Sequence, residues 1–376
     1  MKENLKLCVY AICKNESKFV DRWVNAISEE ADSIVVLDTG STDDTVEKLR
    51  AHGVTVVVKE IKPWRFDVAR NEAMKLVPND CNILLSTDLD EVLEPGWGNI
   101  LREKWIEGVH ERAEYKYSWS HLEDGSDGRI FRYNKIHTRK WVWKAPVHEL
   151  LWNVETKTNL YNYNESLDLF DQIHLHHYPD KTKSRASYLP LLELRAQEDP
   201  NDYYGLIYLA HEYYYRGKYK NSIDTFKNIL EKFKGRYDSV ELASCYLFMG
   251  DSYTEMKDFD HAIDSYKQAI ITEPTYIEPY LDLAKVYIDK QQYKEAVDIT
   301  KDGIAKSYRH YTWLERDTSW SYEPWDLLCI ASYYAGSKKD SIAYAAKALS
   351  YEPNNKRLSD NLKACLNGTG NHEMIK

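Results

Sequence analysis

The sequence lacks a long apolar run, an excess of basic charge and any paired-cysteine motif. No apolar run approaches the ~20 residues of a membrane-spanning helix, so we expect no membrane span. The net charge of −10 provides no basic surface for nucleic acid. The six cysteines show no C-x-x-C spacing and several lie in apolar runs. We therefore expect reduced, buried thiols in a cytoplasmic protein, without a disulfide framework or a zinc site.

The first half of the sequence alternates apolar runs with amphipathic segments. Strands are predicted at residues 5–12, 33–37, 54–58 and 81–87, and helices at 15–29, 45–52 and 65–77. Ser41 and Asp44 have the spacing of a capping box before the second helix. Alternating strands and helices with short connections predict an α/β domain with a parallel, doubly wound sheet.

An acidic stretch, residues 86–91 (STDLDE), follows the fourth apolar run. If the strand continues through it, Asp88 and Asp90 point to one side and Leu89 to the other. Two carboxylates at a strand end suit a hard divalent cation that also takes waters and substrate phosphates. The alternative is an ordinary polar loop after a strand.

Further polar residues fall at the ends of other predicted strands, where ligands bind in open α/β sheets. Asn15 and Glu16 follow the first strand and are candidates for binding. Asp38 follows the second strand, where it would accept from the imide N–H of a uracil ring or simply begin a turn. Arg70 and Asn71 lie early in a helix, where they would face an anion or form a solvated helix face.

Four of these stretches resemble the family 2 glycosyltransferases, nucleotide-sugar enzymes of the GT-A fold, in order and spacing. They are residues 12–16 (ICKNE), 35–45 (VVLDTGSTDDT), 66–73 (FDVARNEA) and 88–91 (DLDE). The resemblance covers residues 5–180. It implies that Asp38 contacts uracil and Arg70 the nucleotide. It also implies that Asp88 and Asp90 form the D-x-D motif, which binds a divalent metal on the diphosphate.

Two later segments carry further candidates. Residues 141–149 (WVWKAPVHE) end in the His–Glu pair that the resemblance places on the acceptor side. Inverting transfer needs a base there, and we expect Glu149 to accept the proton, with His148 as its support or rival. The alternative is that Glu149 pairs with a nearby Lys or Arg and only fixes the loop. The family often adds a late histidine to the metal, so His176 or His177 is a candidate ligand, or these histidines simply end a strand.

Strand signals vanish from Lys181 onward, and a helical pattern recurs. Its small residues are Ala210, Gly250, Ala284 and Ala331. The spacings are 40, 34 and 47 residues; the middle one is the tetratricopeptide period, and the others imply insertions. We therefore predict a GT-A catalytic domain at 1–180 and a tetratricopeptide-like solenoid at 181–376. Such solenoids often bind a peptide or a second subunit on their concave side.

The combination resembles the peptide S-glycosyltransferases that modify bacteriocins. That family uses UDP-sugars with Mg²⁺ or Mn²⁺, transfers to Cys or Ser of a peptide, and forms homodimers through its repeats. The leading hypothesis is a metal-dependent, inverting glycosyltransferase that moves a hexose from a UDP-sugar to a Cys, Ser or Thr side chain of a peptide or protein. One alternative is transfer to a saccharide or small acceptor in surface-polymer synthesis. Another is a repeat scaffold that binds nucleotide without turnover. Nucleotidyl transfer fits Asp38, Arg70 and Asn71 poorly.

Overall fold

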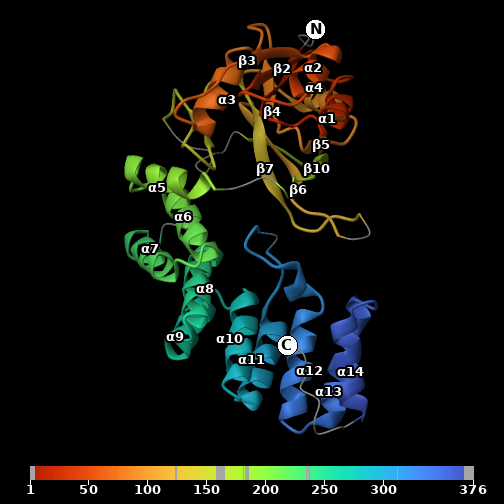
Figure 1. The fold of residues 1–376 in the computed structure, drawn as a ribbon, viewed down its shortest axis with the longest axis vertical. Coiled ribbons are helices and arrows are strands. Elements are labelled where there is room, and N and C mark those ends of the chain that lie inside the picture. The colour runs from red at the N-terminus through yellow and green to blue at the C-terminus, as the bar shows by residue number, and fades with distance from the viewer. Residues whose placement is uncertain are drawn as a thin grey trace. The chain divides into compact units, whose positions relative to one another are not determined.

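The computed structural model describes residues 5–122, 125–157, 166–180, 182, 186–233, 235, 238–310 and 312–367. The chain forms two compact units, Met1–Asp199 and Pro200–Lys376. In Figure 1 the first unit runs from red to yellow-green and the second from green to blue. The first contains strands and helices, whereas the described part of the second is helical. The expected order of an α/β domain followed by helical repeats is confirmed.

Eight strands of the first unit form one mixed sheet in the order β3-β2-β1-β4-β7-β6-β10-β5. These strands are β1 (Leu7–Cys13), β2 (Ser33–Asp38), β3 (Thr55–Val58), β4 (Ile83–Ser86), β5 (Glu91–Leu93), β6 (Arg112–Ser118), β7 (Ile130–His137) and β10 (Ser166–His177). β1 pairs in parallel with β2 and β4, and β2 pairs in parallel with β3. β7 runs antiparallel to β4 and β6. The carboxyl ends of β1, β2 and β4 therefore meet at one edge, as the sequence predicts.

Both faces of the sheet are buried, which explains why β1 reads as an uninterrupted apolar run. Leu7, Val9 and Ala11 lie in one hydrophobic cluster, and Cys8 and Tyr10 lie in another. The first cluster includes residues of α1 (Val20–Ile27), α2 (Thr45–Ala51) and α4 (Trp97–Lys104). The second includes residues of α3 (Phe66–Met74) and of a separate hairpin of β8 (Trp141–Lys144) and β9 (Leu150–Asn153).

Helix α5 (Tyr188–Glu198) belongs to the first unit. Its Arg195 is 2% exposed and donates to the backbone carbonyls of Val147, at 3.0 Å, and His148, at 2.6 Å. Both carbonyls lie in the loop between β8 and β9. This loop has left-handed backbone at Ala145 and His148, with φ of 86° and 49°. A buried guanidinium on a helix thus holds a loop whose own backbone conformation is unfavourable for side-chain-bearing residues.

The described second unit is built mainly from helix pairs. Its helices are α6 (Tyr203–Tyr215), α7 (Tyr219–Lys232), α8 (Ser239–Glu255), α9 (Phe259–Thr272), α10 (Glu278–Asp289), α11 (Tyr293–Lys306), α12 (Glu323–Tyr334), α13 (Lys338–Tyr351) and α14 (Lys356–Asn367). The small residues predicted from the repeat, Ala210, Gly250, Ala284 and Ala331, are buried. A Cβ atom at Gly250 would lie 2.5 Å from the Tyr266 ring, so this position admits the neighbouring helix only as glycine.

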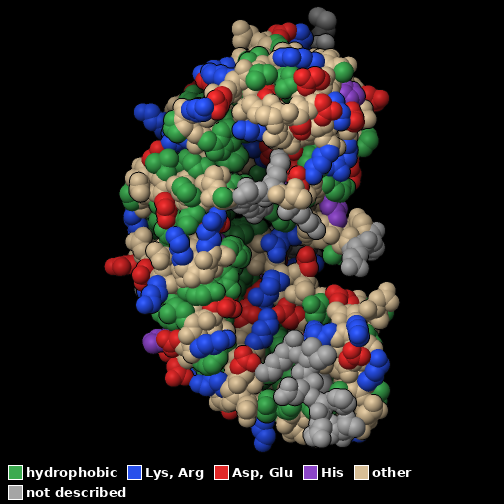
Figure 2. All heavy atoms as spheres, in the orientation of Figure 1, with side chains coloured by type: hydrophobic (Ala, Val, Ile, Leu, Met, Phe, Trp, Pro, Cys, Tyr) green, Lys and Arg blue, Asp and Glu red, His purple; other side chains and the backbone are tan. Residues whose placement is uncertain are grey.

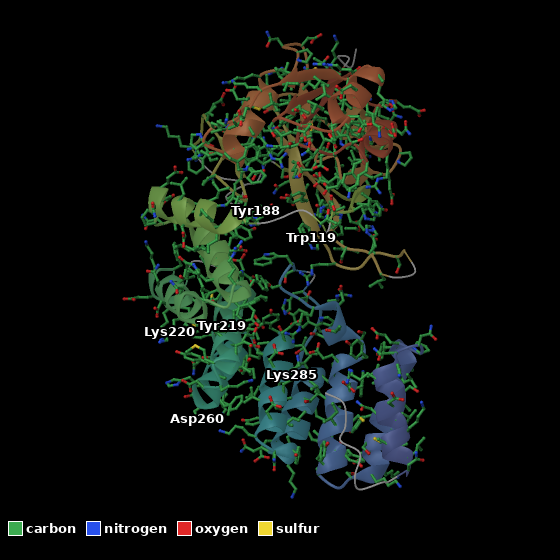
Figure 3. All side chains as sticks on the ribbon, viewed as in Figure 1. Trp119, Tyr188, Tyr219, Lys220, Asp260 and Lys285 are labelled. Carbon is green, nitrogen blue, oxygen red and sulfur yellow. The ribbon has the colours of Figure 1, made fainter. Side chains whose placement is uncertain are left out.

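The connection between α11 and α12 accounts for the longest repeat spacing. It contains a short 3-10 helix, η1 (Asp317–Trp320). Just before η1, the guanidinium of Arg316 makes two bonds to the carboxylate of Asp282, at 2.8 and 3.0 Å. Lys285, labelled in Figure 3, donates to the same carboxylate at 2.8 Å. The insertion is therefore fastened to α10 by charge-assisted hydrogen bonds.

Three features of the described residues concern charge, hydropathy and cysteines. Acidic and basic side chains are interspersed over the face shown in Figure 2. The described residues of that face form no continuous basic surface. Within the described ranges, none of the helices has the length and apolar character needed to cross a membrane. All six cysteines are buried and free of disulfides.

The close approach of α11 to α10 gives a test of the repeat packing. A Cβ atom at Gly303 would lie 2.7 Å from Tyr280 Cβ and 2.9 Å from its Cγ. Gly303→Ala should lower the free energy of unfolding by about 1–3 kcal/mol through overpacking. Urea unfolding of the full chain, followed by circular dichroism, measures this, with Lys301→Ala on the same helix as control. Helix propensity alone favours alanine by about 1 kcal/mol, so a stabilised variant would contradict the close approach.

Candidate active site

The carboxylate of Asp38, at the end of β2, shapes the loop that follows it. Oδ1 accepts from the N–H groups of Gly40 and Ser41, each at 2.9 Å. Oδ2 accepts from the Ser41 hydroxyl and from the Cys13 thiol, the latter at 3.3 Å. A carboxylate offers about four acceptor positions, so these donors occupy it fully. The contact of Asp38 with uracil stays a prediction, and it requires the hydroxyl or the thiol to turn away.

The same loop shows why the capping-box prediction is wrong. The N-cap of α2 is Asp44, and its side chain makes no cap hydrogen bond. Ser41 instead donates to Asp38, three residues earlier. Ser41 thus bonds to the end of the preceding strand and does not cap the helix. The spacing of residues in the sequence does not reveal this choice of partner.

Asn15 and Glu16 join the loop after β1 to the loop after β2. Asn15 has φ 55°, a left-handed conformation that asparagine tolerates better than most residues. Its N–H donates to Ser41 Oγ at 2.8 Å, and its side-chain oxygen accepts from the Thr42 N–H at 2.7 Å. The Glu16 N–H donates to Thr45 Oγ1 at 2.8 Å. Both residues therefore brace the edge of the sheet, and their contact with a nucleotide stays a prediction.

Arg70, on α3, joins three parts of the site through one buried guanidinium. Its side chain is 5% exposed. Nη1 donates to Ser86 Oγ at 3.0 Å, and Nη2 donates to both carboxylate oxygens of Asp88, at 2.9 and 3.1 Å. Nε donates to Oε1 of Glu149. The structure thus links the predicted base to the first aspartate of the predicted metal motif.

Lys135, on β7, is a functional candidate that the sequence analysis missed. Its side chain is 6% exposed, and its ammonium donates to Asp88 Oδ2 at 3.0 Å and to Glu91 Oε1 at 3.1 Å. The sequence signal for it is weak. Lys135 stands two residues from Tyr133 and two residues from His137 on the same strand. That spacing places Lys135 on the face that those two residues occupy.

The charges of this cluster set one another's protonation. Burial would raise the pKa of Asp88, but Arg70 and Lys135 lower it well below its usual range. Burial would lower the pKa of Lys135, and the attraction of Asp88 and Glu91 raises it well above its usual range. Burial raises the pKa of Glu91 despite the attraction of Lys135. At neutral pH the cluster therefore presents a deprotonated Asp88 between two cations.

Asn71, next to Arg70, docks α3 onto the hairpin. Its side chain donates to the Trp143 carbonyl at 2.8 Å and accepts from the Trp143 N–H at 2.9 Å. Trp143 in turn donates from its indole to the Tyr10 hydroxyl at 2.6 Å. These bonds use Asn71 as a structural residue, and its binding of nucleotide stays a prediction. Trp141 and Trp143 are both buried in the core.

Glu149 and His148 point to different neighbours. Glu149 accepts from Arg70, which is the pairing that the sequence analysis set against a catalytic role. The same pairing also brings Glu149 to the cluster that contains Asp88. It is therefore compatible with either role of Glu149, as the base or as a residue that fixes the loop. His148 is exposed, and its ring lies edge-on to Tyr188 of α5 at 5.7 Å between centroids. The structure therefore places Glu149, rather than His148, beside the buried charges.

The two aspartates of the acidic stretch have different surroundings. β4 ends at Ser86, so strand alternation does not govern residues 88–90, and that argument for their orientation was wrong. Asp88 faces Arg70 and Lys135. Asp90 Oδ2 lies 3.5 Å from Nε2 of His177 at the end of β10. Of the two late histidines, the structure thus brings His177 to Asp90, whereas His176 contacts Glu94. A metal at Asp88, Asp90, His176 or His177 stays a prediction.

Two family models match separate parts of the chain. The model of the glycosyl transferase family 2 matches residues 8–148, and the tetratricopeptide repeat model matches residues 253–308. An uncharacterized glycosyltransferase of Rickettsia conorii is 39% identical over 89 residues, which are 23% of this chain and 30% of that protein. The SPbeta prophage-derived glycosyltransferase SunS of Bacillus subtilis is 23% identical over 240 residues, which are 59% of this chain and 53% of SunS.

The matches are partial. The chain spans 30% and 53% of the lengths of these two relatives. Among solved structures, a crystal structure of MamA has a TM-score of 0.37 and 19% identity, covering 47% of this chain and 96% of that chain.

Lys135 gives a test of the buried charge cluster. Lys135→Met keeps the length of the aliphatic chain but removes the ammonium that pairs with Asp88 and Glu91. Because it leaves the buried carboxylate of Glu91 and the partly exposed carboxylate of Asp88 without that partner, we expect the free energy of unfolding to fall by about 3–5 kcal/mol. Lys140→Met, which removes a half-exposed lysine paired with Glu111, should leave the urea midpoint near that of the parent protein. Equal midpoints for the two variants would show that the cluster does not stabilise the fold.

Proposed function

We propose that this protein is an inverting glycosyltransferase, because residues 8–148 match the model of the glycosyl transferase family 2 and residues 253–308 match the tetratricopeptide repeat model. In this proposal it moves a hexose from a UDP-sugar to a Cys, Ser or Thr side chain of a peptide or protein. The similarity to the glycosyltransferase SunS supports the proposal. The observation that carries it is the buried Arg70, which binds both the candidate base and the carboxylate beside the candidate diphosphate site.

Inverting transfer requires two events on opposite sides of the sugar. The acceptor oxygen or sulfur forms a bond to the anomeric carbon, and the bond from that carbon to the diphosphate oxygen breaks, with its electron pair leaving on the UDP. The acceptor proton must pass to a base. In the proposal Glu149 takes this proton on Oε2, since Oε1 already accepts from Arg70. Arg70 and Lys135 supply positive charge near the departing diphosphate.

Asp90, in the turn between β4 and β5, and His177, at the end of β10, fit a divalent cation. Asp90 Oδ2 and His177 Nε2 lie 3.5 Å apart. Two ligands of one cation at ~2.1 Å are separated by ~3.0–3.4 Å, so a small movement would bring both into contact with an ion. A bound Mg²⁺ or Mn²⁺ would neutralise charge on the diphosphate. Asp90 and His177 would hold it, and Asp88, whose side chain is 35% exposed, would face it from beside Arg70.

The second unit suits the acceptor in this proposal. Stacked helical repeats present extended surfaces that bind peptides or further subunits. We therefore assign the peptide acceptor to the repeats, and the same type of surface would form a homodimer. Six buried, free thiols are what a reducing compartment maintains, which favours the cytoplasm.

Asp90 tests the role of the cation. Asp90→Asn removes a charge from the pair with His177, so UDP release from UDP-hexoses with Mn²⁺ should fall at least 100-fold. The Mn²⁺ concentration for half-maximal release should also rise. Asp168→Asn, at an aspartate with a 64% exposed side chain, serves as control and should release UDP at the parent rate. Parent-level release by Asp90→Asn without added metal would overturn the metal assignment.

Glu149 tests the proton transfer. Glu149→Gln can still accept from Arg70 but cannot take a proton, so transfer should fall by about 10²–10⁴-fold while calorimetry shows unchanged UDP affinity. Transfer is read by mass spectrometry of Cys-, Ser- and Thr-containing peptides incubated with a panel of UDP-hexoses. Glu155→Gln, at a glutamate that pairs with Lys140 on the surface, is the matched control. Turnover close to the parent rate in Glu149→Gln would assign the proton to another group.

A further inference from the structure

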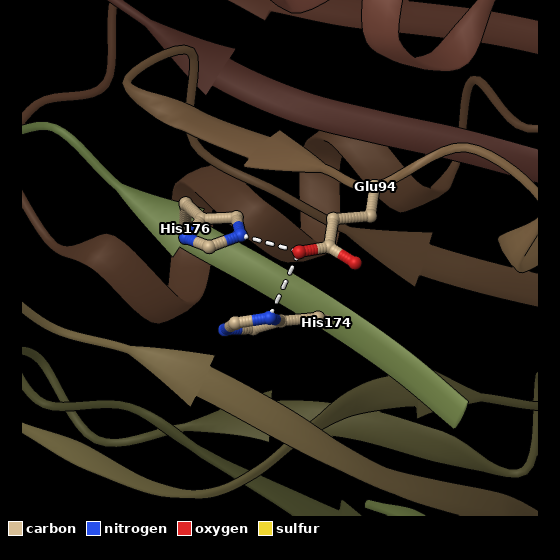
Figure 4. Close-up of side chains that lie close together, drawn as sticks. All are labelled: Glu94, His174 and His176. Carbon is tan, nitrogen blue, oxygen red and sulfur yellow. Dashed lines mark hydrogen bonds and ion pairs between the residues drawn. The ribbon is translucent and has the colours of Figure 1, made fainter. Parts of the chain in front are cut away.

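We propose that Glu94, His174 and His176 form a second cation site, separate from Asp90 and His177, and that it takes a borderline transition-metal ion such as Zn²⁺. Figure 4 shows the three side chains converging, with both imidazoles beside one carboxylate oxygen. His174 and His176 are two residues apart on β10, so strand geometry places both on one face. His177 lies on the other face, where it meets Asp90.

The ligand atoms already surround a common point. Nδ1 of His174 and Nε2 of His176 each lie 3.0 Å from Oε1 of Glu94. All three atoms fall within 4.8 Å of one another. Ligands at ~2.1 Å from one zinc ion are separated by about 3.0–3.4 Å. The two distances between imidazole nitrogens and the Glu94 oxygen already match this separation, so a cation could replace both contacts with metal–ligand bonds.

The donor set selects the kind of ion. Two imidazoles and one carboxylate suit Zn²⁺ and its neighbours, whereas Mg²⁺ prefers oxygen ligands throughout. The histidine side chains are 11% and 17% exposed, and that of Glu94 is 56% exposed. The site is thus mostly buried where the histidines lie and exposed to solvent where Glu94 lies. Solvent can supply a further ligand there, and an ion can enter.

The outer nitrogen of each imidazole has a partner of its own. Nε2 of His174 lies 2.7 Å from Ser118 Oγ, which donates to Asp127 Oδ1 at 2.6 Å. Nδ1 of His176 lies 3.0 Å from Nε2 of His121. Histidines that bind metals usually donate their other ring N–H in this way, which fixes the tautomer and the ring orientation.

Counting the protons in these hydrogen bonds shows what the contact between His174 and Glu94 requires. The hydroxyl of Ser118 has one proton, and Asp127 takes it, so His174 must donate to Ser118 from Nε2. Either a second proton on Nδ1 or a metal ion must then lie between Nδ1 of His174 and Oε1 of Glu94, which are 3.0 Å apart. An ion between them satisfies both lone pairs while every outer hydrogen bond stays intact.

The position of the site gives it a mechanical role. Glu94 follows β5, a strand of three residues that pairs antiparallel with β10, with Leu93 opposite Leu175. An ion held by Glu94, His174 and His176 would fasten this edge of the sheet. Asp90 lies just before β5 and His177 ends β10, so the ion would also steady the proposed donor site. That last consequence rests on the proposed function, whereas the binding of the ion does not.

Metal titration of the full chain tests the site without an enzyme assay. After removal of bound metal with a chelator, the parent chain should take one equivalent of Zn²⁺ from a chromophoric indicator, and bound Co²⁺ should give visible absorption.

The double variant His174→Ala/His176→Ala should lose this equivalent, and Ser118→Ala should weaken the binding of Zn²⁺ about 10–100-fold. His52→Ala, at a histidine whose ring lies 2.7 Å from Asp21, should bind as the parent does. Asp88→Asn/Asp90→Asn should also retain the equivalent, which separates this site from the donor site.

Glu94→Gln guards against loss of fold, because Glu94 is largely exposed. Zn²⁺ should raise the melting temperature of the parent chain and leave that of Glu94→Gln unchanged. The proposal is overturned if the parent and the double histidine variant bind Zn²⁺ with equal stoichiometry and affinity. It is also overturned if Zn²⁺ shifts the melting of Glu94→Gln as much as that of the parent. A loss of binding confined to Asp88→Asn/Asp90→Asn would place the ion at the donor site instead.

Discussion

The buried guanidinium of Arg70 is the interaction on which the first unit depends. It belongs to α3, yet its partners are Ser86 at the end of β4, Asp88 in the following turn, and Glu149 in the hairpin loop. A charge removed from water is tolerated only when it is paired and hydrogen-bonded. Withdrawal of any of these three segments would therefore leave part of the buried guanidinium without its hydrogen-bond partner. The groups proposed for diphosphate and acceptor are held in register before any substrate arrives.

Local pattern in the sequence was enough to predict the architecture. Apolar runs and amphipathic segments predicted the alternation around β1, because β1 is buried on both faces and α1 on one. The small residues of the repeat marked its helix contacts, as at Gly250 against Tyr266. These features repeat at short range, so a window of a few residues contains the whole signal.

The side-chain partners in the site escaped prediction because they are set by tertiary contacts. Arg70 and Glu149 are 79 residues apart in sequence, and no periodicity connects them. Lys135 reads as an ordinary strand lysine until Asp88 and Glu91 are placed beside it. The alternation argument failed at Asp90 because β4 stops at Ser86. On β10 the strand continues to His177, so alternation does separate its imidazoles onto two faces.

The two hydrogen bonds that Arg195 donates to the loop between β8 and β9 have a practical consequence for expressing the two units separately. The repeat pattern suggests that the first half of the chain could be expressed alone as residues 1–180. Such a fragment would lack α5, and the carbonyls of Val147 and His148 would lose the guanidinium that holds them. The segment bearing Glu149 would then relax, and an inactive fragment would say nothing about the chemistry. A fragment that ends at Asp199 keeps Arg195 with the first unit and is the better choice for separate expression.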